Sequence, residues 1–142
     1  MATGFGAGYS PFIPGTAGTL VAIPVYYLFS FLPFPLYEMT LLTFFFFSSW
    51  VSKQAEAVLG KKDDRRIVID EIMGFLVTML WMPPSLPTLI VGFILFRIFD
   101  ILKPFPIRRL ESVPSGFGVV LDDVMAGVYA TISLRGIFLL WK

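Results

Sequence analysis

The stretch GFILFRIFDILKPFPI, residues 92–107, begins as an apolar run and then carries Arg97, Asp100 and Lys103 at three-residue intervals. This spacing places neighbouring charges on one side of a helix, and the two prolines that follow end it. One interpretation is an ion pair plus a lysine that extends to the membrane interface. The other is a functional site at the end of a membrane-embedded helix, which acids from other segments at the same depth would favour.

The composition places the chain in the membrane class. Of its 142 residues, 56% are hydrophobic and 15% are charged, against about 25% charged in ordinary soluble domains. The length predicts one domain, residues 1–142, and so many apolar side chains exceed what one small core can bury. The net charge of +1 gives no reason to expect a nucleic-acid partner, whereas a lipid bilayer is expected. The sequence does not determine the oligomeric state.

Five hydrophobic segments predict the fold class, an all-α polytopic membrane helix bundle. No basic residue precedes the first apolar run, as a secretory signal would require, so residues from Met1 onward are expected in the mature chain. The predicted segments are residues 18–32, 37–52, 67–82, 86–102 and 121–141.

The loops between these segments predict the orientation. Residues 33–35 and 82–87 contain no Lys or Arg, whereas residues 53–66 and 103–109 contain eight. Loops rich in Lys and Arg stay in the cytoplasm. The basic loops and the N-terminus are therefore expected to face the cytoplasm.

Most of the acids gather at the same predicted membrane face. A carboxylate at the bilayer centre costs about 2.5–3.5 kcal/mol, so it needs a cation, a metal ion or a polar cavity. Asp70 or Glu71 alternatively pairs with a nearby arginine, and Asp122 or Asp123 alternatively caps a helix. Adjacent carboxylates also suit a hard divalent cation. The seven acids expected at this face are Asp63, Asp64, Asp70, Glu71, Asp100, Asp122 and Asp123.

The start of the first segment offers an anion site. Gly15, Thr16, Gly18 and Thr19 stand where exposed backbone N–H groups at a helix start bind anions, although a plain helix cap explains them equally well. Carboxylates for a metal, bases for a phosphate and this glycine-rich start together suit phosphoryl chemistry on a lipid headgroup. The chain has no His and no Cys, which excludes bases and nucleophiles of those types.

Four motifs, in this order, resemble the bacterial phosphatidylglycerophosphatase A family over about residues 4–130. They are PGTAGT (14–19), IVIDEIMG (67–74), FRIFDILKPFPI (96–107) and GFGVVLDDVMAG (116–127). Ser115 stands where members of the family often have Gly, a departure that removes no catalytic group.

The resemblance implies a Mg²⁺-dependent, multi-pass phosphatase of the inner (cytoplasmic) membrane. Such an enzyme removes the terminal phosphate of phosphatidylglycerophosphate to give phosphatidylglycerol, a step of phospholipid biosynthesis. The resemblance places catalysis on Asp63, Asp70, Glu71, Asp100, Asp122 and Asp123. It places the metal on Asp70, Glu71, Asp100, Asp122 and Asp123, and the substrate phosphate near Pro14, Gly15, Thr16, Arg97 and Lys103.

Two other functions compete with this hypothesis. A phosphatidyl-group transferase also uses acids and a metal at the cytoplasmic membrane face, but the Asp-Gly-x-x-Ala-Arg signature of that class is missing. An ion or proton carrier would place its carboxylates near the midplane with access to both sides. The predicted charged cluster lies on one side, which argues against a carrier.

Overall fold

A computed structural model describes residues 14–60, 68–110 and 117–141, and every regular element in these ranges is a helix. The prediction of an all-α fold is therefore confirmed for the described residues. The helices are α1 (Pro14–Ser30), α2 (Phe34–Leu59), α3 (Ile69–Thr78), α4 (Leu86–Leu102), α5 (Ile107–Leu110) and α6 (Phe117–Trp141).

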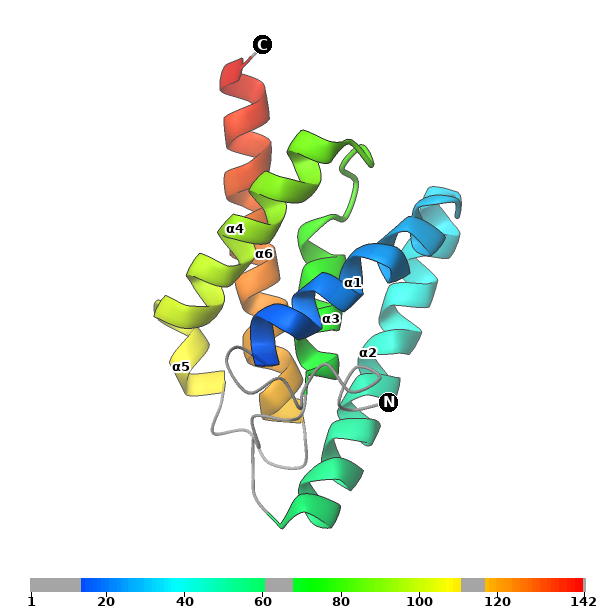
Figure 1. Ribbon diagram of the computed structural model, residues 1–142, viewed down its shortest axis with the longest axis vertical. Coiled ribbons are helices and arrows are strands. Elements are labelled where there is room, and N and C mark those ends of the chain that lie inside the picture. Colours follow the sequence, from blue (N-terminus) through cyan, green and yellow to red (C-terminus); the bar gives the residue numbers. More distant parts are fainter. Residues whose placement is uncertain (1–13, 61–67, 111–116, 142) are drawn as a thin grey trace.

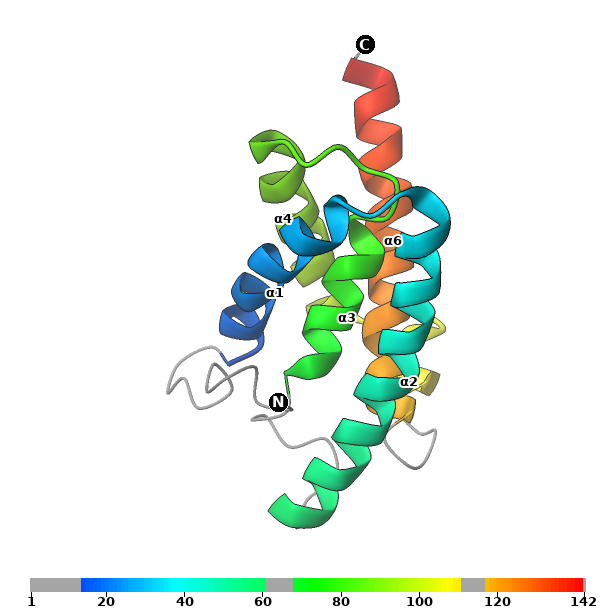
Figure 2. The ribbon, with the colours of Figure 1, turned by 90° about the vertical axis from the view of Figure 1, so that its right-hand side faces the viewer.

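Helix α3 forms the centre of the bundle, with α1, α2 and α6 packed around it and α4 packed mainly on α6 (Figure 1). Nine of its 10 residues are buried. Each of the five longer helices runs opposite to the one before it along the chain, so α1, α3 and α6 share one direction (Figures 1 and 2). The charged starts of α3 and α6 therefore lie at the same end of the bundle as the end of α4.

The helix ends follow local signals in the sequence. Pro35 occupies the first turn of α2, and Gly60 ends that helix with a left-handed φ of 70°. The hydroxyl of Ser85 accepts a hydrogen bond from the Thr88 N–H at the start of α4. Lys103 ends α4 with a left-handed φ of 46°, directly before the prolines.

Helix α3 is shorter than the hydrophobic segment predicted over residues 67–82. It stops at Thr78, and with 10 residues it is about 15 Å long. Trp81 adopts a left-handed φ of 62°, and two prolines follow it, so the helix does not continue.

The two parallel helices α3 and α6 approach each other closely at two glycines. A Cβ atom on Gly74 would lie 2.7 Å from the Asp123 carbonyl oxygen, and one on Gly127 would overlap the Gly74 carbonyl oxygen. Four residues later, the Thr131 hydroxyl lies within hydrogen-bonding distance of the backbone carbonyls of Val77 (2.9 Å) and Thr78 (3.1 Å) and of Gly127 on its own helix (2.8 Å). These contacts recur at matching positions along α3 and α6. They therefore fix how far one helix is shifted along the other.

The length and composition of a helix determine whether it can cross a membrane. In the described part of the chain, one helix is long and apolar enough to cross a membrane, over residues Val120–Leu140. A third of its residues are buried, and a core helix of a soluble protein can pass the same test. Residues Thr16–Ser30 form a shorter apolar helix. The prediction of five membrane-crossing segments is not confirmed by this criterion and stays a prediction.

Candidate metal and phosphate site

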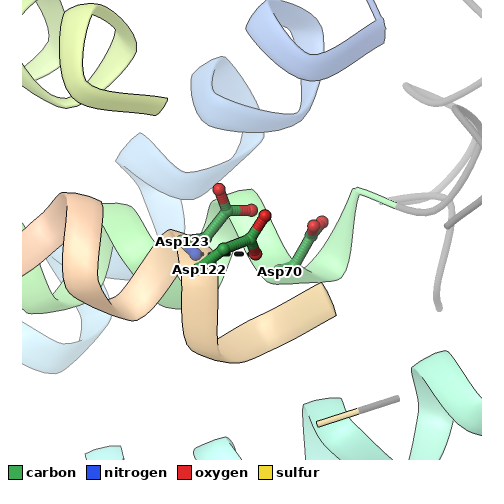
Figure 3. A group of neighbouring side chains, drawn as sticks. All are labelled: Asp70, Asp122 and Asp123. Carbon is green, nitrogen blue, oxygen red and sulfur yellow. Dashed lines mark hydrogen bonds between the residues drawn. The ribbon is translucent and has the colours of Figure 1, made fainter. Parts of the chain in front are cut away.

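The crossing of α3 and α6 brings three aspartates together. Asp70 lies four residues before Gly74, and Asp123 lies four residues before Gly127. Residues four apart share a helix face, so each aspartate lies one turn below the close contact and points toward the other helix. Oxygen atoms of Asp70, Asp122 and Asp123 lie within 4.8 Å of one another (Figure 3).

Hydrogen bonds orient the aspartates. Oδ1 of Asp122 accepts a hydrogen bond from the Asp123 backbone N–H (2.8 Å), and Oδ1 of Asp70 accepts one from the Glu71 backbone N–H (3.0 Å). Lys103, at the end of α4, donates from Nζ to Oδ2 of Asp122 at 2.9 Å. Three helices therefore position this cluster.

The cluster concentrates negative charge away from solvent, since each of the three aspartates is at most 5% exposed. Two ionised carboxylates about 4.8 Å apart repel each other by roughly 3 kcal/mol at an effective dielectric constant of about 20. Three ionised aspartates beside Lys103 carry a formal charge of −2. One divalent cation would balance that charge, and carboxylate oxygens are the ligands that hard cations prefer.

Glu71 and Asp100 extend the acidic cluster. Oε2 of Glu71 is buried and has no hydrogen-bond partner among the described residues. Both Glu71 and Asp100 lie near enough to Asp123 to interact with it electrostatically. A buried, unpaired carboxylate oxygen beside three aspartates fits a further metal ligand, directly or through water.

Arg97 forms an ion pair with Asp100, one turn along α4. Its Nε is buried and has no hydrogen-bond partner among the described residues, so the guanidinium keeps donor capacity beside the acids. Both bases predicted to bind phosphate thus already contact a carboxylate, Arg97 contacting Asp100 and Lys103 contacting Asp122. These contacts hold both cations at the acidic cluster.

The predicted anion cradle lies at the start of α1. This helix begins at Pro14, so Gly15 and Thr16 stand in its first turn, where backbone N–H groups have no partner within the helix. A Cβ atom on Gly18 would lie 2.6 Å from Cβ of Val68, which directly precedes α3. The close contact brings the start of α1 to the start of α3, near Asp70.

Most predicted site residues thus come from neighbouring helix ends, while Asp63 lies outside the described residues. The sequence reasoning did not identify Gly74 and Gly127, which allow the aspartates to meet. A signal was available, because DEIMG (70–74) and DVMAG (123–127) both place a glycine four residues after an acid. The reasoning also did not identify the contact between Lys103 and Asp122, for which the sequence contains no local signal.

Comparison with known proteins identifies the family of this chain. A family model described as phosphatidylglycerophosphatase A matches residues 1–138. The chain is 39% identical over 130 residues to phosphatidylglycerophosphatase A of Escherichia coli K12, covering 90% of this chain and 76% of the relative. It is 37% identical over 138 residues to the protein of that name in Haemophilus influenzae, covering 93% and 83%.

A third relative carries a different name. The chain is 41% identical over 140 residues, or 93% of its length and 87% of the relative, to a Bacteroides thetaiotaomicron protein provisionally named a phosphatidylinositol-3-phosphatase. No solved structure matches the chain. The match to the family model over nearly the whole chain, with two similar relatives of the same name, shows that this chain belongs to the phosphatidylglycerophosphatase A family.

Proposed function

We propose that this protein hydrolyses the terminal phosphate of phosphatidylglycerophosphate, giving phosphatidylglycerol and inorganic phosphate. The observation that carries the proposal is the buried cluster of Asp70, Asp122 and Asp123 beside two cations, in a chain of this family. Acids for a metal and bases for a phosphate at one end of the bundle are the parts that phosphoryl transfer needs.

The donor set supports Mg²⁺ as the cofactor. The candidate ligands are carboxylate oxygens of Asp70, Asp122 and Asp123, with Glu71 and Asp100 close by. An all-oxygen set with no His or Cys suits Mg²⁺ better than zinc or copper. When bound, Mg²⁺ would act as a Lewis acid on the phosphoryl oxygens and activate water.

The side chains of the chain itself have separate roles in this proposal. Arg97 and Lys103 bind phosphate oxygens, together with the backbone N–H groups of the first turn of α1. Carboxylates of the acidic cluster act as general bases that accept a proton from water. Hydrolysis breaks the bond between phosphorus and the glycerol oxygen and forms one to the water oxygen, while a proton passes from water to the leaving oxygen.

The direct test is phosphate release from phosphatidylglycerophosphate in detergent–lipid micelles, with Mg²⁺ and with excess chelator. Asp70→Asn and Asp123→Asn keep side-chain size but remove charge, and each should lower turnover about 10²–10³-fold. Glu38→Gln, at the other end of the bundle, is the matched control and should stay near normal. Full turnover in chelator, or folded and fully active Asp variants, would refute the metal site.

A second substrate distinguishes phosphatase activity in general from specificity for phosphatidylglycerophosphate. Phosphatidylinositol 3-phosphate also carries a phosphomonoester, and one relative is named for it. We expect faster release from phosphatidylglycerophosphate. Faster release from the inositol lipid would overturn the substrate assignment and leave the phosphatase chemistry standing, whereas no release from either lipid would refute both.

We further propose that the bundle is embedded in the inner membrane with its acidic end in the cytoplasm. The support is the apolar outer surface: α4 exposes a large apolar side chain on nearly every turn, and α2 does the same along its first two thirds. The residues on α4 are Leu86, Ile90, Ile94, Ile98 and Ile101, and those on α2 are Leu36, Met39, Leu42, Phe46 and Trp50. A soluble monomer rarely exposes so large an apolar surface.

Cysteine labelling in intact cells tests this topology, because the chain has no Cys. Ser85→Cys, between α3 and α4, should react with a membrane-impermeant maleimide from outside. Val58→Cys, 84% exposed near the end of α2, is the matched control and should react only after permeabilisation. The opposite pattern would reverse the orientation, and labelling of both sites in intact cells would refute membrane embedding in this form.

A further inference from the structure

The end of the bundle opposite the acidic cluster contains a cavity of about 370 Å³. Its walls combine one cation with apolar side chains. The lining residues are Trp81, Met82, Pro83, Arg135, Phe138 and Leu139. Among the described residues, none that lines the cavity is acidic, and the charged one, Arg135, is positive.

Arg135 is held in this wall by an aromatic contact. Its guanidinium carbon lies 4.6 Å from the centroid of the Trp81 ring, and the guanidinium forms no hydrogen bond or ion pair with the described residues. A stacked guanidinium keeps its five N–H donors at the edge of its plane. Those donors match the geometry of phosphate oxygens. Arginine binds an anionic phosphate more strongly than it binds a neutral carboxamide or hydroxyl.

Trp81 is itself fixed in place. Its indole N–H donates to Oε1 of Glu38 on α2 at 2.9 Å, and its backbone is in the left-handed region, at a φ of 62°. A bulky residue seldom adopts that conformation. The ring therefore contacts Glu38 through its N–H edge and Arg135 through its face, and Glu38 is not among the described residues that line the cavity.

From this arrangement we infer a second, non-catalytic site that binds the phosphate of an anionic phospholipid. The phosphate pairs with Arg135, and the first methylenes of the lipid lie against Met82, Pro83 and Phe138. Leu139 in the same wall is 73% exposed, so the apolar side of the cavity opens to the surface of the bundle. A phospholipid satisfies both features at once, since it joins an anion to an apolar chain, whereas free phosphate would leave the apolar wall uncovered.

Trp81 provides the readout. The chain has three tryptophans, so replacing Trp50 and Trp141 with Phe leaves Trp81 as the only emitter. The purified variant is titrated in detergent with dihexanoyl-phosphatidylglycerol, dihexanoyl-phosphatidylcholine or inorganic phosphate. We expect a saturable change in emission with the anionic lipid, and binding about tenfold weaker for the other two probes.

Arg135→Gln should weaken binding of the anionic lipid about tenfold, and Arg135→Lys should preserve the order of the three probes. As a control, Lys53→Gln removes one exposed positive charge from the second half of α2, far from Arg135. It should leave the binding of all three probes unchanged. Equal responses to both lipids, or to inorganic phosphate, would refute the site without any Arg135 variant. An unchanged titration with folded Arg135→Gln would refute it as well. None of these outcomes depends on catalysis, so they are independent of the proposed activity.

Discussion

Replacing Gly74 with Ala should disturb the proposed site without touching any charged group. In the structure, a Cβ atom at this position would lie 2.5 Å from Cε2 of Phe96 and 2.7 Å from the Asp123 carbonyl oxygen. An ordinary contact of this kind is at least 3.4 Å. Phe96 is fully buried, and the other contact is backbone, so neither neighbour can simply turn away.

The size of the effect follows from these distances. To restore the contact with Asp123, α6 must retreat by about 0.7 Å, which moves Asp122 and Asp123 away from Asp70. Displacement of reacting groups by about 1 Å costs on the order of 10²-fold in rate, so we expect a loss of about 10- to 100-fold. Overpacking should lower the free energy of unfolding by about 1–3 kcal/mol. The better helix propensity of Ala offsets about 1 kcal/mol of this loss.

Gly136→Ala on α6 is the matched control, because no described atom outside the neighbouring part of its own helix lies within 4 Å of a Cβ added there. It should keep full turnover and gain up to about 1 kcal/mol of stability. Both variants are compared for phosphate release at saturating Mg²⁺ and for thermal unfolding in detergent. Wild-type turnover in a folded Gly74→Ala variant would refute the idea that this crossing sets the geometry of the aspartates.

Two further substitutions test the site and the helix pair around it. Arg97→Lys keeps the charge but cannot form the planar, multi-donor contact, so turnover should fall at least about tenfold in the phosphate-release assay; normal turnover would place Arg97 outside phosphate binding. Thr131→Val removes a buried hydroxyl that lies within hydrogen-bonding distance of carbonyls on both α3 and α6, and it should lower the free energy of unfolding in denaturant by about 1 kcal/mol. The exposed hydroxyl of Thr43 bonds only within α2, so Thr43→Val should change little, and equal losses in both threonine variants would contradict a specific role for Thr131.

The sequence by itself determined the local elements. Apolar runs predicted five segments, and each contains one of the helices α1, α2, α3, α4 and α6 or overlaps most of it. Local signals such as Pro35, Ser85 and Gly60 mark helix ends because they act on the nearest few residues. Two features escaped this reasoning: the one-turn helix α5 and the early end of α3, where Trp81 adopts a left-handed backbone that no local pattern predicts.

The sequence also predicted that acids from three segments gather at one end, because alternating helix directions bring the ends of successive segments together. Only the tertiary structure decided which side chains meet. Asp70 meets Asp122 and Asp123, whereas Asp100 pairs with Arg97, and Lys103 with Asp122. The contacts between the aspartates depend on how closely α3 and α6 approach and on how far one is shifted along the other. Gly74 on α3 and Gly127 on α6 set both. Helical periodicity specifies the face on which a residue lies, but the partner of that face is fixed only when the whole bundle packs.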